Sequence, residues 1–202
     1  MSHYYINDPG LKSEIRKITY DYRGHRLVMY TDRGVFARER VDFGTHLLLQ
    51  SFVPPEKKDV RALDIGCGYG IIGLALAKAY PGFRVELSDV NKRAVDLARR
   101  SALEMKLKNA KAYAGDLYEN AEGLFDVIIT NPPIRAGMAT VEAIFAQGYE
   151  RLAPGGYLWA VMRKRQGAKR MMEKAAALSG FLETVLVKKG YCVFYIKKPL
   201  TF

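Results

Sequence analysis

The chain has 202 residues, 49% of them hydrophobic and 11% aromatic, so it can bury the core of about one domain. It contains no uncharged apolar run of about 18 residues and no charged-then-apolar leader at Met1, so we expect neither a membrane span nor a signal peptide. Lys and Arg number 32 against 21 Asp and Glu, and the resulting net charge of +11 favours a polyanionic partner such as nucleic acid.

The cysteines and histidines are too few and too widely spaced to predict a metal centre. Cys67 and Cys192 are the only two cysteines, and His3, His25 and His46 are equally scattered. Neither a zinc site nor a disulfide framework can be built from this set, so we expect no metal cofactor. Free thiols fit a reducing compartment, and we expect a cytoplasmic protein.

The N-terminal quarter differs in pattern from the rest of the chain. The first ten residues predict a loose arm, and the β-rich runs that follow, divided by the turn signals YRGH and TDRG, predict two or three short strands. The segment VDFGTHLLLQSF then predicts a glycine turn followed by a helix that Pro54 and Pro55 end. We therefore expect residues 1–55 to form a small β-rich extension that packs on a main domain over residues 56–202.

From Val60 onward, strand and helix patterns alternate. Strands are predicted over 60–65, 84–90, 110–116, 125–131, 156–163, 181–189 and 191–198, and helices over 70–80, 91–107, 140–152 and 166–180. This alternation indicates a Rossmann-like α/β fold with a mainly parallel seven-stranded sheet. The last two strands are joined too closely to be parallel, so we expect a C-terminal antiparallel hairpin at the edge.

The segment LDIGCGYG follows the first main strand and precedes a helix, which is where ligands bind in an open α/β sheet. Its glycines allow a tight turn and close approach of a ligand to the backbone. Gly68, Gly70 and Gly73 also satisfy the dinucleotide spacing GxGxxG. Asp64 would repel a pyrophosphate and attract an ammonium group, which favours S-adenosylmethionine over a dinucleotide.

Two further acidic residues follow the next two strands. Asp89 is placed to accept hydrogen bonds from both ribose hydroxyls of an adenosine, although capping of the next helix is the alternative. Asp116 is placed to accept a hydrogen bond from the adenine amino group, with a turn aspartate as the competing interpretation. Both residues predict an adenosine-containing ligand, and neither distinguishes S-adenosylmethionine from NAD.

The segment ITNPPI ends the fourth main strand. The two prolines make a rigid loop with few N–H donors. The side-chain carbonyl of Asn131 and the backbone carbonyl of Pro132 can both accept hydrogen bonds from an NH2 group. Together they would hold a planar amine with its lone pair directed at a methyl donor.

These motifs carry a resemblance to a known family. LDIGCGYG, SDVN, AGDLYE and NPPI are similar to the motif series of class I S-adenosylmethionine-dependent amino-methyltransferases, and VDFGTHLLL with NPPIRAG resembles the RsmC-like family in a short, single-domain form. That family methylates guanine N2 in small-subunit ribosomal RNA. The resemblance implies the class I methyltransferase fold, S-adenosylmethionine as cofactor, and ribosomal RNA or the small ribosomal subunit as partner.

The resemblance also implies roles for individual residues. The cofactor site would comprise Asp64, Gly66, Cys67, Gly68, Gly70, Asp89, Val90, Asp116, Leu117 and Asn131. The catalytic residues that take the target amine would be Asn131, Pro132 and Pro133, and the substrate would contact Ile134 and Arg135. Position 134 is not the aromatic residue that is common after NPP, so the expected stacking partner of a flipped base is absent there.

Other functions fit parts of the pattern. A protein glutamine amide also presents an NH2 group to an NPP loop, and another RNA or DNA amine would do so as well. A nicotinamide oxidoreductase would use the GxGxxG spacing, and an inactive RNA-binding module could keep the fold. Basic residues outside the motifs are candidate RNA contacts: Arg38, Arg40, Arg163, Lys164, Arg165, Lys169, Arg170, Lys188 and Lys189.

Overall fold

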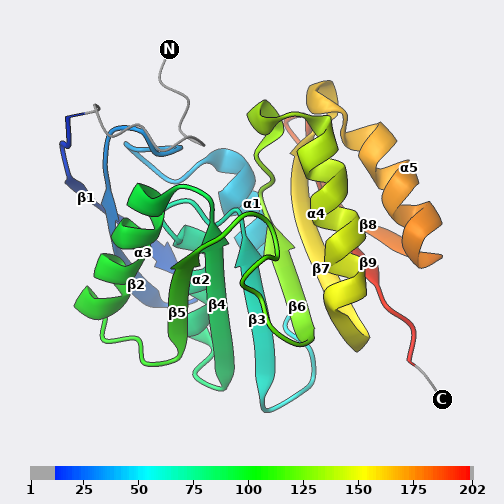
Figure 1. Ribbon diagram of the computed structural model, residues 1–202, viewed down its shortest axis with the longest axis horizontal. Helices are drawn as coiled ribbons and strands as arrows, with labels where there is room; N and C mark the ends of the chain where they lie inside the picture. The colour runs from blue at the N-terminus through cyan, green and yellow to red at the C-terminus, as the bar shows by residue number, and fades with distance from the viewer. Residues whose placement is uncertain (1–11, 201–202) are drawn as a thin grey trace.

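The computed structural model describes residues 12–200 (Figure 1), so the expected arm over residues 1–10 lies outside the described residues. Strands β1 (Arg16–Tyr22) and β2 (His25–Thr31) pair as an antiparallel hairpin. Its turn residues Arg23 and Gly24 have φ angles of 47° and 78°, the conformation whose twist suits a two-residue hairpin. The segment VFAR forms turns and bends instead of a third strand.

A seven-stranded sheet forms the centre of the molecule (Figure 1), in the order β5-β4-β3-β6-β7-β9-β8. Its strands are β3 (Val60–Ile65), β4 (Phe83–Asp89), β5 (Ala110–Ala114), β6 (Phe125–Thr130), β7 (Leu152–Arg163), β8 (Leu182–Lys188) and β9 (Tyr191–Lys197). The first five of these strands are parallel, and β8 and β9 form the antiparallel edge hairpin. The expected Rossmann-like fold is confirmed.

Strand β7 begins at Leu152, earlier than the expected start at Gly156, because a register shift opposite β6 accommodates the Pro-Gly-Gly segment. The strand order reverses between β3 and β6: the chain runs outward through β4 and β5 and then returns to the other side of β3. In open α/β sheets, such a reversal leaves a crevice at the carboxyl ends of the strands.

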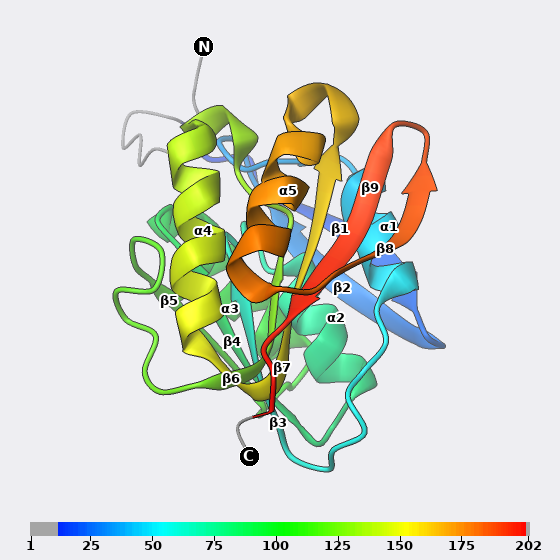
Figure 2. The ribbon, with the colours of Figure 1, turned by 90° about the vertical axis from the view of Figure 1, so that its right-hand side faces the viewer.

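Helices cover both faces of this sheet. They are α1 (Phe43–Ser51), α2 (Ile71–Ala79), α3 (Lys92–Glu104), α4 (Met138–Arg151) and α5 (Ala168–Ser179). Helices α1 to α3 share one hydrophobic cluster with alternate residues of the sheet, and α4 and α5 share the other. Figure 2 looks toward the β8–β9 edge, with α4 and α5 on one side of the sheet and α1 and α2 on the other.

The β1–β2 hairpin packs on the side of α2 and α3. Its buried residues belong to the same hydrophobic cluster as those helices, and the amide of Tyr30 donates to Ser101 Oγ at 2.9 Å. A salt bridge of 3.3 Å joins Arg93 to the buried carboxylate of Asp32. The N-terminal segment and the sheet therefore share one core, and a division into units at residue 55 stays a prediction.

Helix α1 begins one residue after Asp42, whose carboxylate accepts hydrogen bonds from the amides of Gly44 and Thr45 at 2.9 and 3.3 Å. Gly44 lies inside the first helical turn, not in the turn that the sequence suggested. A Cβ at this position would lie 2.7 Å from Tyr191 Cε1 in β9. Glycine is therefore required because α1 approaches the C-terminal hairpin closely.

A short segment after β5 is held against α4 by one buried tyrosine. Tyr118 is 2% exposed, and its hydroxyl donates to the carbonyl of Ile144 at 2.8 Å. Gly148, one turn further along α4, leaves room for the tyrosine ring. This contact fixes the segment that begins at Asp116, a predicted adenine contact.

Gly148→Ala is expected to lower the free energy of unfolding by about 2 kcal/mol through overpacking. The added Cβ would lie 2.4 Å from Tyr118 Oη and 2.7 Å from Leu158 Cδ1. Urea denaturation of the single and double variants would measure the effect. Because Tyr118→Phe removes the nearest clashing atom, the alanine should cost less in that background. Equal costs in both backgrounds would contradict this packing.

Candidate active site

A cleft of about 440 Å³ opens at the carboxyl ends of β3, β4, β5 and β6. It brings together twelve of the predicted site residues: Gly66, Cys67, Gly68, Asp89, Val90, Asp116, Leu117, Asn131, Pro132, Pro133, Ile134 and Arg135. Two predicted cofactor residues, Asp64 and Gly70, do not line it. The cleft is within the size range of small-molecule sites.

The glycine loop forms the floor of the cleft. The amides of Gly66 and Cys67 both donate to the carbonyl of Ser88, at 2.9 and 3.0 Å, which fixes the loop to the end of β4. Gly66 and Gly68 have φ angles of 68° and 55°, in the left-handed region that favours glycine. A Cβ on Gly68 would meet no atom within 4 Å, so the missing side chain leaves open space for a ligand.

Gly70 has a different purpose. It precedes α2 with a φ of 89°, and a Cβ there would lie 2.8 Å from Ala98 Cβ and 3.1 Å from Leu87 Cδ2. This glycine therefore allows α2 to approach α3 and β4. The structure shows no direct part for it in the cleft.

The carboxyl group of Asp64 lies beneath the loop, fully buried. Its Oδ2 accepts a hydrogen bond of 2.8 Å from the amide of Gly73 in the first turn of α2, while Oδ1 is buried without a hydrogen-bond partner among the described residues. Burial raises the pKa of Asp64 to about 7, and the nearby charge of Asp89 adds to this effect. The expected contact of Asp64 with an ammonium group stays a prediction.

Asp89 lines the cleft and joins the glycine loop to the start of α3. Its Oδ2 accepts from the amide of Gly68 and its Oδ1 from the amide of Asn91, both at 2.8 Å. The helix N-cap is Asn91, whose side chain accepts from two amides of α3. Burial raises the pKa of Asp89. Because each carboxylate oxygen can accept a second bond, the group can still receive a pair of hydroxyls.

The other acidic residue of this half of the cleft comes from the neighbouring strand. The amide of Gly115 donates to the carbonyl of Asp89 at 3.1 Å, so Asp116 follows directly beside the end of β4. The side chain of Asp116 is exposed, and Val90 and Leu117 complete the apolar lining. This half of the cleft therefore combines two carboxylates with an apolar surface, as a nucleoside requires.

The side-chain amide of Asn131 is hydrogen-bonded to residues at the N-terminus of α1. Its Nδ2 donates to Thr45 Oγ1 at 2.9 Å and to Asp42 Oδ2 at 3.3 Å. With both N–H groups used in this way, the side-chain carbonyl is the part of Asn131 that can accept bonds from a ligand. The orientation of the Asn131 side chain is thus set by residues that precede it by more than 80 positions.

The rest of the NPPI segment forms the adjoining wall. The carbonyl of Pro132 accepts from the amide of Ile134 at 2.9 Å and keeps a second lone pair for a ligand. A short 3-10 helix, η1 (Ile134–Ala136), then carries Arg135 into the lining. Thr130 Oγ1 donates to the carbonyl of Ile65 at 2.8 Å, so this wall is tied to the strand that precedes the glycine loop.

The structure adds cleft residues that the motifs did not identify. Asp42, Thr45, Gln166 and Tyr191 line it, and so does Arg163, which the sequence indicated only as a candidate RNA contact. The sequence DFGT before an apolar run carried a usable signal for a helix N-cap. No sequence pattern indicates its contact with Asn131.

Within residues 12–200, no helix is long and apolar enough to cross a membrane. The same residues contain no group of three or more His, Cys, Asp or Glu side chains placed to hold a metal ion. The polar groups that line the cleft are backbone groups, carboxylates, hydroxyls, the side-chain amides of Asn131 and Gln166, and basic side chains.

Comparison with known proteins places this cleft in a family. Residues 26–195 match the family model of the methyltransferase small domain. The uncharacterized protein YbxB of Bacillus subtilis is 41% identical over 198 residues, which cover 97% of this chain and 98% of YbxB. Ribosomal RNA small subunit methyltransferase C of Actinobacillus pleuropneumoniae is 34% identical over 147 residues, 71% of this chain and 44% of that protein.

Among solved structures, the chain is similar to the T. thermophilus 16S rRNA N2 G1207 methyltransferase (RsmC) in complex with AdoMet and guanosine. The TM-score is 0.81 at 28% sequence identity, and the match covers 94% of this chain and 52% of that chain. The chain thus spans about half the length of the RsmC proteins that it matches. The resemblance to the RsmC-like family is confirmed. Since the matched region contains both the glycine loop and the NPPI segment, the chain belongs to the methyltransferase small domain family.

Proposed function

We propose that this methyltransferase transfers a methyl group from S-adenosylmethionine to an exocyclic amine, guanine N2 of small-subunit ribosomal RNA. The observation that carries the proposal is the fixed orientation of Asn131, whose carbonyl is left for an amine beside the glycine loop. Methyltransferase relatives whose names specify small-subunit ribosomal RNA, and an RsmC structure with AdoMet and guanosine, support this choice of donor and acceptor.

The cleft residues fit the cofactor. Gly68 leaves the space that a Cβ would fill, and the carboxylate of Asp89 keeps acceptor positions for a ribose diol. Asp116 lines the cleft at the adjoining strand end, and we assign it to the adenine amino group. S-adenosylmethionine, when bound, supplies an electrophilic methyl group on a sulfonium centre.

In this proposal the NPPI segment positions the target amine. Asn131 Oδ1 and the carbonyl of Pro132 accept the two amine hydrogens, which directs the nitrogen lone pair outward from the NPPI wall. These acceptors also stabilise the positive charge that develops on the nitrogen as it is alkylated. No covalent enzyme intermediate is needed, so alignment of the two reactants supplies much of the acceleration, and the methylated nitrogen then releases one proton to solvent. A base within an RNA helix would have to leave its stack to reach this wall.

The direct test uses the full chain, cofactor labelled in the methyl group, and ribosomal RNA transcribed without modifications. Nucleoside analysis of the product is expected to show label in N2-methylguanosine. Label in protein glutamine, or in another nucleoside, would overturn the assignment of the acceptor. A parallel reaction with total protein as acceptor separates these outcomes.

Asn131→Ala is expected to retain S-adenosylmethionine affinity within about threefold and to lower kcat by about a hundredfold or more, since it removes one acceptor for the developing charge. Calorimetry measures cofactor affinity, and methyl release to RNA measures kcat. Asn131→Asp keeps the oxygen but places a second carboxylate against Asp42, so it should also be impaired. Near wild-type transfer by the alanine variant would refute the role of Asn131.

Thr45→Val and Thr45→Ser form a matched pair for the hydrogen bond between Thr45 and Asn131. Valine keeps the branched shape but removes the acceptor, so kcat should fall about tenfold, as expected for one lost hydrogen bond. Serine keeps the oxygen and should remain within about twofold of the wild type. If the two variants had equal rates, the orientation of Asn131 would not depend on α1.

Asp64→Asn tests whether this buried carboxyl supports the loop or contacts the ligand. The pKa of Asp64 is about 7 in the folded protein and about 3.9 in an unfolded chain. A raised folded pKa penalises the ionised form, so Asp64 should cost stability as the pH rises from about 4 to about 7. Relative to the asparagine variant, the wild type should lose free energy of unfolding across this window.

Asparagine can still accept the bond from Gly73, and the carboxyl does not line the cleft. We therefore expect the cofactor affinity of the variant to stay within about threefold of the wild type at pH 8. A loss above about tenfold would assign Asp64 to the ammonium group of the cofactor instead. A stability difference independent of pH would contradict the raised pKa.

A further inference from the structure

Two exposed basic segments meet beside the end of the cleft that holds Asn131. Arg163 ends β7, Lys164 and Arg165 begin the short 3-10 helix η2 (Lys164–Gln166), and Lys188 and Lys189 lie at the β8–β9 turn. Arg163 pairs with Tyr191 across the sheet, and the amide of Lys164 donates to the carbonyl of Gly190 at 2.8 Å. We call these five residues the basic rim.

The rim is continuous with the cleft through two aromatic rings. The guanidinium of Arg163 lies 4.5 Å from the ring centroid of Tyr191, and both residues line the cleft. Lys189 Nζ lies 5.3 Å from the ring of Phe43, which packs edge-on against Tyr191 at 5.7 Å. Cation–π contacts of this kind hold two of the charges in place while leaving their N–H groups for a ligand.

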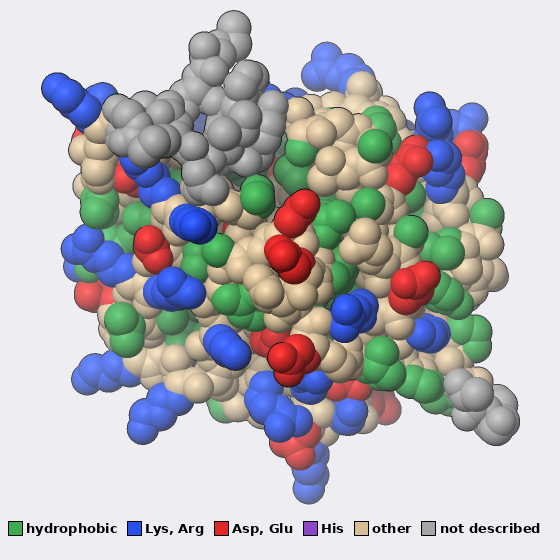
Figure 3. Space-filling view, in the orientation of Figure 1, with side chains coloured by type: hydrophobic (Ala, Val, Ile, Leu, Met, Phe, Trp, Pro, Cys, Tyr) green, Lys and Arg blue, Asp and Glu red, His purple; other side chains and the backbone are tan. Residues whose placement is uncertain are grey.

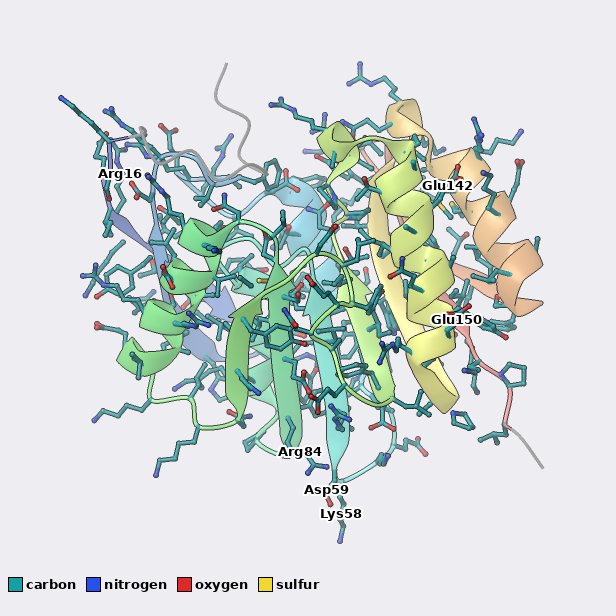
Figure 4. The ribbon with its side chains drawn as sticks, in the orientation of Figure 1. Arg16, Lys58, Asp59, Arg84, Glu142 and Glu150 are labelled. Carbon is teal, nitrogen blue, oxygen red and sulfur yellow. The ribbon has the colours of Figure 1, made fainter. Side chains whose placement is uncertain are left out.

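The side chains of the rim form no salt bridges among the described residues. Within residues 12–200, none of the five side chains takes part in an ion pair, whereas Arg170 and Lys174, which follow on α5, share Glu142 (labelled in Figure 4). Glu183 precedes Lys188 by five positions on an extended strand, about 17 Å away. That exceeds the screening length of about 10 Å at 0.1 M salt.

Other basic residues are spread over the molecule. Figure 3 shows Lys and Arg side chains across a whole face, with Asp and Glu among them. Lys58 and Arg84, for example, lie at the amino ends of the parallel strands, the edge of the sheet opposite the cleft (Figure 4). The rim therefore differs from them in its position beside the amine site.

We propose that the basic rim is a docking surface for RNA, where Arg163, Lys164, Arg165, Lys188 and Lys189 hold the phosphates that flank the target nucleotide. This inference rests on the proposed function, since it assumes that the methylated base belongs to RNA. Proteins that bind single-stranded nucleic acid combine positive charges, which contact the phosphates, with aromatic rings. The rim has both, next to the cleft that would receive the base. The strand enters the cleft from the side of the β8–β9 turn.

The test compares two triple variants that each remove three positive charges. The rim variant combines Lys164→Gln, Arg165→Gln and Lys188→Gln. It leaves Arg163 and Lys189 unchanged, because these two side chains contact aromatic rings. Lys58→Gln/Arg84→Gln/Lys108→Gln alters the opposite end of the sheet and serves as the control. All six residues are exposed, none lines the cleft, and none has a salt bridge among the described residues.

The probe is a fluorescein-labelled transcript of unmodified small-subunit ribosomal RNA, and its binding is measured by anisotropy between about 50 and 200 mM KCl. The rim variant should bind at least tenfold more weakly at 100 mM salt. The slope of log affinity against log salt should fall by about 2, because about three phosphate contacts are lost. The control should change both quantities far less, and all three proteins should bind S-adenosylmethionine equally.

The outcomes separate this inference from the proposed function. If the wild type methylates RNA while the rim variant binds it with unchanged affinity and salt slope, the rim assignment is wrong and the proposed function stands. Equal losses in the two triple variants would also overturn it, since net charge alone would explain the binding. If the wild type neither binds nor methylates RNA, the proposed function and the rim both fail.

Discussion

The contact between Asn131 and the N-terminus of α1 is the constraint on which the cleft depends. An asparagine amide can present either its carbonyl or its NH2 group, and only the carbonyl can receive an amine substrate. Asp42 and Thr45 take the NH2 group, so they decide which face Asn131 shows to the cleft. The same Asp42 carboxylate also caps α1, which couples the start of this helix to the orientation of the site.

The position of α1 also depends on the C-terminal hairpin of the sheet. Helix α1 can lie where it does because Gly44 has no side chain to collide with Tyr191 in β9. Tyr191 in turn supports Arg163 at the end of β7 and lines the cleft. One packing contact thus connects Asn131, the C-terminal hairpin and the basic rim. A change at the β8–β9 hairpin would reach Asn131 through α1.

The two ends of the cleft differ in their electrostatics. The cofactor half holds Asp89 and Asp116, with Asp64 buried beneath the loop, whereas the other half holds Arg135 and Arg163 together with Asp42, whose carboxylate bonds to Asn131 and the start of α1. A cofactor with a positive sulfonium and ammonium group would bind beside the carboxylates. A polyanionic acceptor would meet the arginines.

Local patterns were sufficient for the order of strands and helices, the glycine loop and the NPPI segment, because each depends on short-range periodicity or on backbone geometry of Gly and Pro. The same patterns identified twelve residues that do line the cleft. Two others, Asp64 and Gly70, lie in the same motif but have structural contacts instead, since the Asp64 carboxylate bonds to the first turn of α2 and Gly70 packs closely against α3 and β4. Only the tertiary structure decided the hydrogen bonds of Asn131 with Asp42 and Thr45, and the hydrogen bond of Lys164 with Gly190. These bonds join segments that are far apart in the sequence and become neighbours only when the helices and strands pack on the common core.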